Sequence, residues 1–492
     1  MPLPRERLGQ GNGGNTPALE LTRGPAADWA QRTGNWGPVE RWVGRLQERI
    51  FRVSREGKWR KVKHLQRLLV RSWSAKVLAI RDVTERNQGR STPGVDSKVY
   101  LTADARENLS HEDLDYRTHR PLPAKRAYIP KGDGRRRPLG MPTIKSRVVQ
   151  DMVKMALEPE WEAKFEANSY GFRPGRSCHD AVAAIKQAVR DFKKRGYEAW
   201  VFEADIASCF DRIAHEPLLA HLHLFRGVVR RWLKAGVVEL GHFEPTEEGT
   251  PQGGVISPLL ANIALDGLER LFTGKWWARV VRYADDFVIV AATKRIIEFT
   301  IRPAVEQFLA ERGLELNARK TGVVSLDQGF NFLSFTFRRF SGKLLVTPQK
   351  EKVQHFLQHL KVILVANKQA RHRDLIVLLN PVIRGWVNYY RFCNATRAFN
   401  RVDYLLFWKL WRWARRRHPS KPREWVRQKY FRGGNGMLHW CFGEKGGLQL
   451  QAAEATHLLW YRKIAGLASP FDARWRDYWQ RRVRYVVATL QV

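Results

Sequence analysis

Two adjacent carboxylates, Asp285 and Asp286, stand between two short apolar runs of the sequence. Val280 and Val281 precede them, and residues 287–290 (Phe-Val-Ile-Val) follow them. Two β-forming runs around a polar tip predict a β-hairpin. Carboxylates held on a stiff tip are the oxygen ligands that a divalent metal ion needs to stabilise phosphoryl transfer. The same Asp-Asp pair is also ordinary turn chemistry, so the interpretation depends on residues elsewhere in the chain.

A third carboxylate, Asp205, directly follows a run with strand-like alternation, residues 199–204. Two strands that each present a carboxylate near one end could bring Asp205 and Asp285 together around two metal ions. Because neighbouring residues of a regular strand point to opposite faces, we expect Asp285 to lie beside Asp205 and Asp286 to contribute less directly. A lone Asp is more commonly a helix N-cap or a turn residue.

These carboxylates belong to an ordered series of motifs. The others are residues 128–131 with 137–140, 169–177 (Ser-Tyr-Gly-Phe-Arg-Pro-Gly-Arg-Ser), 249–262 (beginning Gly-Thr-Pro-Gln-Gly-Gly), 317–321, 330–337, 384–391 and 408–414. In order and spacing the series resembles the reverse transcriptases encoded by bacterial and organellar group II introns. The resemblance covers roughly residues 40 to 490, and the ordered set is far more specific than any one motif. Ser334 departs from the pattern, which has Gly at this position.

The resemblance implies an α+β fold of the right-hand polymerase type. Fingers and palm with an antiparallel sheet would be followed by a helical thumb and a small basic C-terminal region, with no Cys/His-rich nuclease module after it. The composition of the first residues, rich in Gly, Pro and Asn, predicts disorder there. The expected parts are a disordered segment (1–35), a helical N-terminal extension (36–96), fingers and palm (97–340), a thumb/maturase domain (341–435) and a DNA-binding region (436–492).

The resemblance also implies roles for single residues. Asp205, Asp285 and Asp286 would be catalytic, and Asp205, Asp285 and Ile206 would bind two Mg²⁺ ions, with Mn²⁺ as the alternative ion. Phe210 would exclude the 2′-hydroxyl of a ribonucleotide. The other expected substrate-binding residues are Lys131 and Arg137 on a fingertip, Gln252 at the incoming nucleotide, Tyr283 at the primer end, and Lys320. By composition alone, the two fingertip cations would be solvated loop residues and Phe210 a core residue.

The charge of the chain points to a polyanionic partner. Its 86 Lys and Arg exceed 48 Asp and Glu, which gives +38. Nucleic acid is the default partner for such a charge, and an anionic membrane surface is the competitor. No apolar run approaches the roughly 18 residues of a membrane-spanning helix, so we expect no membrane partner. The four cysteines are too scattered for a Cys-x-x-Cys site, which indicates free thiols in a reducing cytoplasm.

Basic residues concentrate in residues 341–435, where 21 Lys and Arg stand against four Asp and Glu. Five Trp lie in the same stretch. Phosphates would take this charge and unpaired bases could stack on exposed rings, which suits RNA. At helical spacing, however, most of these Trp are expected to be buried. The expected nucleic-acid-binding residues are Arg173, Arg384, Arg415, Arg416 and Arg417.

The leading interpretation is an RNA-directed DNA polymerase that also binds its intron RNA as a maturase, assisting splicing and intron mobility by target-primed reverse transcription. Its partners would be intron RNA, target DNA and deoxynucleoside triphosphates. It would be cytoplasmic in a bacterium and associated with the nucleoid when acting on DNA. One alternative is an RNA-binding splicing cofactor without polymerase activity, against which the intact carboxylates argue. The other is a domesticated reverse transcriptase of DNA repair or phage defence.

Overall fold

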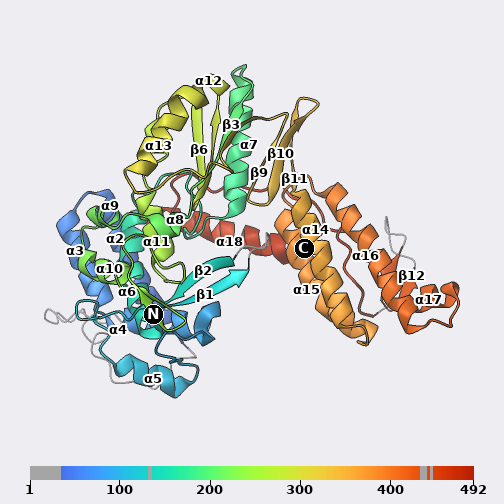
Figure 1. The fold of residues 1–492 in the computed structure, drawn as a ribbon, viewed down its shortest axis with the longest axis horizontal. Coiled ribbons are helices and arrows are strands. Elements are labelled where there is room, and N and C mark those ends of the chain that lie inside the picture. Colours follow the sequence, from blue (N-terminus) through green and yellow to red (C-terminus); the bar gives the residue numbers. More distant parts are fainter. Residues whose placement is uncertain (1–34, 131–135, 433–439, 444–446, 492) are drawn as a thin grey trace, which may run out of the picture.

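The computed structural model describes residues 35–130, 136–432, 440–443 and 447–491. They form an α+β fold with four small β-sheets among many helices. Figure 1 shows three regions: helices α2 to α6 near the N-terminus, a sheet with β3 and β6 flanked by α7 and α13, and the bundle of α14, α15 and α16. The segment 1–35, predicted to be disordered, lies outside the described residues except for its last residue.

The N-terminal helices form because apolar residues recur at helical spacing. Trp42, Leu46 and Ile50 line the buried face of α2 (Gly37–Arg55), and a similar stripe is buried on α3 (Trp59–Val70). Both helices and α4 (Trp73–Arg81) pack on α6 (Ile144–Glu162). These helices are therefore an integral wall of the molecule, with their basic residues on the outer faces.

The sheet that carries the carboxylates has the order β6-β7-β3-β8. Its strands are β6 (Ala278–Tyr283), β7 (Asp286–Ala291), β3 (Trp200–Asp205) and β8 (Gly322–Ser325), all antiparallel to their neighbours. Successive residues of β7 are buried in two different cores: Phe287 and Ile289 face one, and Val288 and Val290 face the other. Both faces of the sheet are therefore covered, and the carboxylates lie at the ends of β3 and β7 rather than on either face.

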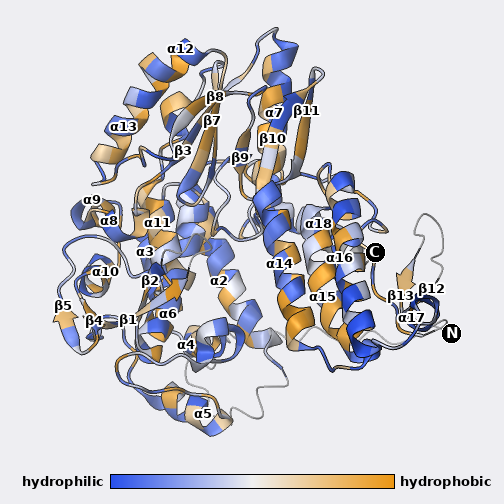
Figure 2. Ribbon diagram, turned by 45° about the vertical axis from the view of Figure 1, so that its right-hand side comes forward, coloured by the Kyte–Doolittle hydropathy of each residue, from blue (hydrophilic) through white to orange (hydrophobic). Residues whose placement is uncertain are grey.

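Helix α7 (Cys178–Lys194) covers one face of this sheet. Its N-terminus has a capping box, in which the Asp180 carboxylate accepts a hydrogen bond from the Ser177 main-chain N–H (3.0 Å). A hydrophobic stripe of Ala181, Ile185 and Val189 faces the strands. In Figure 2 the strands and the bundle helices α14 and α15 carry many hydrophobic residues, as expected for buried layers.

The bundle that follows the sheet consists of α14 (Lys350–Ala366), α15 (His372–Tyr390) and α16 (Thr396–Arg417). A three-stranded sheet with the order β11-β10-β9 leads into it. Ser334, at the turn before β10, has a left-handed backbone (φ 69°), which explains why a Gly is the easier residue there.

The other strands are β1 (Ala124–Pro130), β2 (Arg136–Met141), β4 (Val237–Glu239), β5 (His242–Glu244), β9 (Phe330–Phe332), β10 (Phe335–Phe340), β11 (Lys343–Pro348), β12 (Phe431–Arg432) and β13 (Cys441–Phe442).

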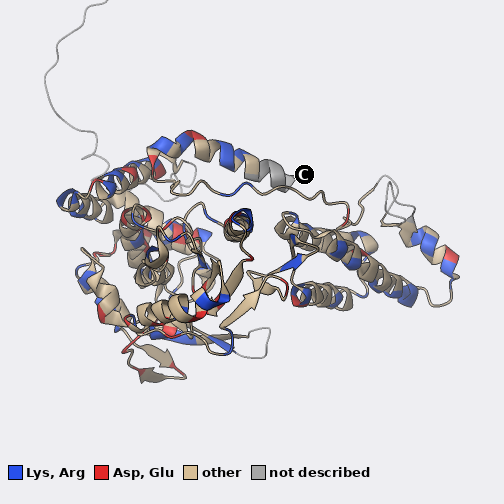
Figure 3. Cartoon of the chain, turned by 90° about the horizontal axis from the view of Figure 1, so that it is seen from above, with Lys and Arg blue, Asp and Glu red and all other residues tan. Residues whose placement is uncertain are grey.

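The remaining helices connect these layers. They are α5 (Ala103–His111), α8 (Cys209–Arg212), α9 (His215–Ala220), α10 (Arg226–Leu233), α11 (Ser257–Ala264), α12 (Lys294–Ile296), α13 (Arg302–Ala310), α17 (Arg423–Tyr430) and α18 (Arg476–Gln491), with short helical turns at Asp82–Arg86, Gln88–Ser91, Arg270–Phe272, Ile297–Ile301 and Ala473–Trp475. Figure 3, seen from above, shows Lys and Arg scattered over the outer helix faces of every region. Across the described ranges, no helix combines the length and apolar character required to span a bilayer.

Residues 458–484 return from the bundle to the sheet, and we call them the C-terminal strap. The Arg482 guanidinium donates to the buried Asp180 carboxylate (2.9 Å), and Arg476 pairs with Glu48 of α2 (3.1 Å). The strap thus joins the N-terminal helices to α7, and Figure 1 shows α18 crossing the centre of the molecule. Arg482 is half-buried, and its pair with Asp180 gives it a structural role.

Candidate active site

The predicted hairpin is formed by β6 and β7, with Tyr283 opposite Asp286. On the other side of β7, Asp205 of β3 is also paired with Asp286. Residues directly opposite on neighbouring strands point to the same face, and a hydrogen bond joins the two carboxyl groups. Asp285 lies in the turn, where the alternation of a regular strand does not apply. The register therefore puts Asp286, rather than Asp285, directly across from Asp205.

The three carboxyl groups repel one another at the strand tips. Burial raises the pKa of Asp285, and the nearby Asp205 carboxylate raises it further. Burial likewise raises the pKa of Asp286 to about 7, with additional repulsion from Asp285 and Asp205. The Lys320 ammonium lies 2.9 Å from Asp205 Oδ2, and the Asn317 side-chain amide donates to the same oxygen (3.1 Å). One lysine beside three carboxyl groups leaves an excess of negative charge that attracts cations.

This donor set fits a divalent ion that shares its ligands with a substrate. Nowhere in the described ranges do three or more His, Cys, Asp or Glu side chains form a metal-binding group. Mg²⁺, however, usually binds one or two carboxylates and completes its shell with phosphate oxygens. Ile206 can add a main-chain carbonyl, because the hydrogen bonds around it are made by its neighbours, at the Asp205 carbonyl (2.8 Å) and the Ala207 N–H (3.0 Å).

The turn of the hairpin is held from below by Arg282. This side chain is buried, and its guanidinium donates to the Ala284 carbonyl (3.1 Å) and to Asn262 Oδ1 (2.9 Å). Asn262 in turn donates to the Gly171 carbonyl (2.8 Å). A Cβ at Gly171 would lie 2.3 Å from the Ala284 nitrogen, so only glycine permits this approach. Residues 169–177 and the carboxylate hairpin, far apart in sequence, thus form one unit.

The fingertip strands lie against the loop of the 249–262 motif. Arg137 of β2 is exposed, and its guanidinium donates to Gln252 Oε1 (2.6 Å). The Gln252 amide donates to the Asp211 carboxylate (3.2 Å). A Cβ at Gly253 would lie 2.4 Å from the Gly140 carbonyl, so this glycine allows the loop to reach β2. The structure therefore brings Arg137 and Gln252 together, and the attraction between Arg137 and Asp285 offsets part of the rise in the pKa of that carboxyl that burial causes.

Phe210 lies in α8, just beyond Asp205 in the chain. It is buried, and its ring meets the ring of Phe172 edge to face with 6.2 Å between centroids. Phe172 has a left-handed backbone (φ 59°) and is half exposed. The Phe210 carbonyl accepts a hydrogen bond from the Thr250 N–H (2.6 Å), which fixes Phe210 to the loop that holds Gln252. The rings of Phe210 and Phe172 thus form an aromatic wall beside this loop.

The outcome for the other predicted residues is mixed. Tyr283 ends β6 and is half-buried, with its pKa raised by burial. Lys131 lies outside the described residues. The prediction that Arg173 binds nucleic acid is wrong: the side chain is buried, pairs with the Glu162 carboxylate (2.7 Å) and donates to the Glu166 carbonyl (2.6 Å). No donor of this guanidinium is left facing solvent for a phosphate.

The basic residues of the bundle divide into two groups. Arg384 and Arg416 are exposed and stay predicted nucleic-acid contacts. Arg415 and Arg417 are half-buried, and each donates to a main-chain carbonyl (2.6 Å), of Lys421 and Ala370 respectively. The expectation that most Trp of this region are buried is wrong: only Trp413 of the five is buried, Trp408 is exposed, and Trp386, Trp411 and Trp425 are half-buried.

Sequence reasoning missed three residues of the site. Asn317 supports Asp205, and its position three residues before Lys320 was the available signal. Arg282 supports the hairpin turn, and its position directly after Val280 and Val281 in an apolar strand was the available signal. Phe172 contacts Phe210, and nothing in its local sequence predicts that contact, because the two residues come together only through the fold.

Comparisons with known proteins identify the family of this chain. A family model described as reverse transcriptase (RNA-dependent DNA polymerase) matches residues 129–337. The N-terminal domain of reverse transcriptase matches residues 29–112, and the maturase-specific domain of group II introns matches residues 353–431. Protein YkfC of Escherichia coli is 35% identical over 355 residues, which are 62% of this chain and 92% of that protein.

The chain belongs to the group II intron reverse transcriptase family. The group II intron-encoded protein LtrA of Lactococcus lactis is 28% identical over 421 residues, 65% of this chain and 69% of that protein. This reverse transcriptase is accordingly an RNA-directed DNA polymerase with a maturase domain, and its family uses divalent metal ions. Among solved structures, telomerase from Candida albicans in complex with a fragment of telomeric RNA aligns with a TM-score of 0.37 and 14% identity, covering 63% of this chain and 65% of that one.

Proposed function

We propose that Asp205, Asp285 and Asp286 form the catalytic site of this reverse transcriptase and hold two Mg²⁺ ions together with the Ile206 carbonyl. The carrying observation is the register that sets Asp205 opposite Asp286 beside the turn with Asp285. The reaction joins the primer 3′-oxygen to the α-phosphorus of a deoxynucleoside triphosphate and breaks the bond to pyrophosphate. When bound, the ions would activate the 3′-hydroxyl and neutralise the leaving group.

The surrounding residues would bind and orient the reactants. Arg137, 2.6 Å from Gln252, places a cation and an amide where a triphosphate approaches the carboxylates. In the absence of substrate, Lys320 offsets the charge of Asp205, and it would be free to pair with a phosphate when Asp205 binds a cation. Tyr283, paired with Asp286 across the hairpin, would position the primer end. Lys131 completes the proposed fingertip contacts.

Phe210 would select deoxynucleotides by filling the space beneath the sugar. Its carbonyl is tied to Thr250, and its ring is backed by Phe172, so the aromatic wall has little freedom to move. A 2′-hydroxyl would then clash with the ring. Replacing Phe210 with Val should admit ribonucleotides in primer extension, and unchanged rejection would remove Phe210 from this role.

The maturase role would lie with the bundle and the basic outer faces. Residues 341–435 carry 21 Lys and Arg against four Asp and Glu, and Arg384 and Arg416 are exposed there. Structured intron RNA would take up this charge, and the RNA would supply the splicing chemistry. Target DNA would be the second partner, which would bring the protein to the bacterial nucleoid. We retain the division of the chain at residues 96, 340 and 435 as part of this proposal.

The test is primer extension on an RNA template with Mg²⁺ and deoxynucleotides. Asp205→Asn should lower the rate of primer extension about 10³-fold or more. The substitution removes a carboxylate ligand of the ions that would stabilise the negative charge on the phosphoryl group. Glu203→Gln is the matched control, two residues earlier on the same strand, and should extend primers at nearly the wild-type rate. Extension by the Asp205→Asn protein at the wild-type rate would contradict the proposal.

A further inference from the structure

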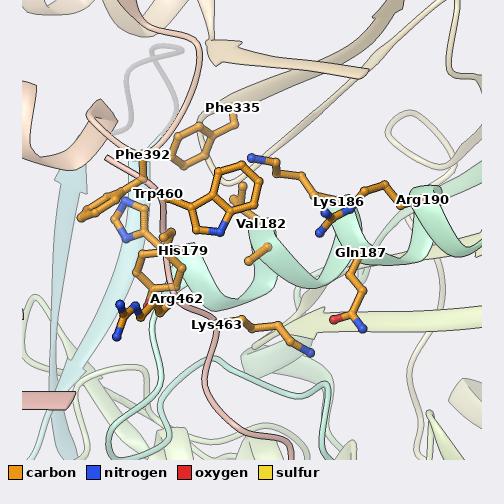
Figure 4. A pocket seen from close by; sticks show the side chains of 12 residues that line it. His179, Val182, Lys186, Gln187, Arg190, Phe335, Phe392, Trp460, Arg462 and Lys463 are labelled. Carbon is orange, nitrogen blue, oxygen red and sulfur yellow. The ribbon is translucent and has the colours of Figure 1, made fainter. Parts of the chain in front are cut away.

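Two adjoining hollows lie beside α7, on the side of the molecule where the strap passes. The first, about 180 Å³, is lined by α7, by Phe335 and Phe392, and by strap residues 460–463 (Figure 4). The second, about 870 Å³, continues along α7 to the hairpin of β10 and β11. Lys186, Arg190 and Trp460 line both hollows, so the two form one continuous groove, which we call the α7 groove.

The α7 groove is separate from the polymerase site. Its walls include none of the catalytic carboxylates, nor Arg137 or Gln252. The apolar stripe of α7 packs on the sheet, whereas Lys186, Arg190 and Lys193 lie on the other faces of the helix. A ligand in the groove would therefore leave the strand tips open.

Among the described residues, most of the cations that line the groove have no carboxylate partner, although the Glu198 carboxylate also lines it. In the described part of the chain, Lys186, Arg190 and Lys343 make no ion pair, whereas Arg339 at the rim is paired with Glu198 (3.1 Å). Lys186 and Arg190 are four residues apart on one helix, and burial together with this repulsion lowers the pKa of Lys186. Lys463 and Arg462 of the strap also line the first hollow, and Figure 4 shows them below α7. Phosphate groups would relieve the repulsion between these positive charges.

Trp460 adds an aromatic surface to this row. Its side chain is 70% exposed, although burial of so large an apolar ring would normally be favourable. Its position is nevertheless fixed: the Tyr485 hydroxyl donates to the Trp460 carbonyl (2.6 Å), and the Leu459 N–H donates to the Arg391 carbonyl (2.8 Å). The Lys186 ammonium lies 5.0 Å from the centre of the ring. The fold thus presents the indole to solvent beside a cation.

We propose that the α7 groove binds a segment of single-stranded nucleic acid, with one base stacked on Trp460 and the flanking phosphates at Lys186, Arg190 and Lys343. An exposed aromatic ring between unpaired cations is what an unpaired base and its phosphates require, and paired bases in a duplex would not offer a free face. Gln187 at the rim can donate to or accept from a base edge. The site is additional to the polymerase site, and it rests on the proposed role in nucleic-acid binding.

The test measures a second binding event on protein whose polymerase site is already occupied. The full chain is saturated with unlabelled template–primer and titrated with a fluorescent single strand of about 12 nucleotides, as oligo(U) RNA or oligo(dT) DNA. Trp460→Ala should weaken binding about tenfold, in line with the usual loss of one stacked base. Lys186→Ala/Arg190→Ala should flatten the salt dependence by about 1.4 in log–log slope, as expected for two lost phosphate contacts.

The controls change the same residue types outside the groove. Phe299→Ala removes a ring that is 74% exposed, and Lys294→Ala/Arg302→Ala removes two charges on α12 and α13. Both controls should bind the single strand like wild type. If the groove variants also bind like wild type, or if no second strand binds at all, the proposal is overturned. A protein ligand for Trp460 would produce that same result.

The two arms identify the source of the strand. Tighter binding of RNA would assign the groove to intron or template RNA, and tighter binding of DNA would assign it to a target strand. Primer extension by the Trp460→Ala protein should stay at the wild-type rate, because the groove lies apart from the carboxylates. If wild-type protein does not extend primers, only the proposed polymerase function is contradicted, because binding to the groove is measured without catalysis.

Discussion

Two groups of three carboxyl groups lie close to the hairpin and differ in how they are neutralised. The catalytic carboxylates, Asp205, Asp285 and Asp286, lie near two cations: Lys320 pairs with Asp205, and Arg137 attracts Asp285. The buttress carboxylates, which we define as Glu162, Glu166 and Asp266, are surrounded by three guanidinium groups, those of Arg173, Arg270 and Arg282. The first group lies at the open strand tips, and the second is buried beneath the hairpin.

The same residue type can therefore serve either chemistry or architecture, depending on how its charge is paired. A buried carboxylate whose two oxygens are both held by a guanidinium, as those of Glu162 are by Arg173, stabilises a fixed arrangement and is not available to a ligand. Carboxylates that outnumber the nearby cations repel one another and destabilise the fold, and a bound cation relieves this repulsion. Arg282 links the two groups, because it lies among the buttress carboxylates and donates to the turn at Ala284.

The largest expected effect comes from breaking the buttress. Arg173→Met removes two hydrogen bonds from the buried Glu162 and should destabilise the protein by about 3–5 kcal/mol. Urea denaturation followed by circular dichroism measures this loss. Arg302→Met, which breaks an exposed pair with Glu306, is the control and should cost about 0.5 kcal/mol or less. Equal effects of the two substitutions would show that the buttress is not special.

A second effect of similar size should depend on pH. Burial, with repulsion from Asp266, raises the pKa of Glu166 to about 7, above its ordinary value of 4.5. Between these values the unfolded chain has released the proton and the folded chain has not, so stability falls as pH rises from 4.5 to 7. A shift of this size corresponds to roughly 3 kcal/mol at most. Asp151 and Glu203 also have pKa values raised to about 7, so in Glu166→Gln protein the stability should fall less across this range than in wild type. An unchanged pH dependence of the denaturation curves would contradict the contribution of Glu166.

A smaller effect should separate the turn from the rest of the sheet. Arg282→Lys keeps the buried charge but replaces a planar fork with a point donor, so the Ala284 carbonyl and Asn262 can no longer both be held in place. We expect kcat for primer extension to fall about tenfold, roughly 1.4 kcal/mol, with KM for the nucleotide unchanged. Arg279→Lys on the same strand is the matched control. A rise in KM at constant kcat would argue against a positioning role for Arg282.

Much of this comparison could be predicted from local sequence. The alternation before Asp205 and the apolar runs around Asp285 and Asp286 gave both strands and the hairpin, because those patterns are local. The proximity of the two strands was also expected, because a carboxylate near the end of each strand could bind the same metal ions. Which carboxylate lies opposite Asp205 did not follow, because register depends on the turn and on pairing across the sheet.

The buttress could not be predicted in the same way. Arg173 belongs to a motif next to the palm and reads as a surface cation, and only the fold shows that Glu162 and two carbonyls enclose it. Arg482 reads as part of a basic run, yet its partner Asp180 is 302 residues away in the sequence. Long-range ion pairs leave no local pattern, so a charge count overestimates how many cations remain for nucleic acid.

The most direct test compares thermal stability with and without Mg²⁺ at pH 8, above the pKa of about 7 to which burial raises Asp286. Asp286→Asn relieves repulsion by Asp205 and Asp285, so without Mg²⁺ the variant should melt at a higher temperature than wild type. Added Mg²⁺ should raise the melting temperature of wild type and have little effect on the variant. If Asp286→Asn instead melts lower without Mg²⁺ and responds to Mg²⁺ like wild type, the strand tips are a structural cluster and the proposed metal site is wrong.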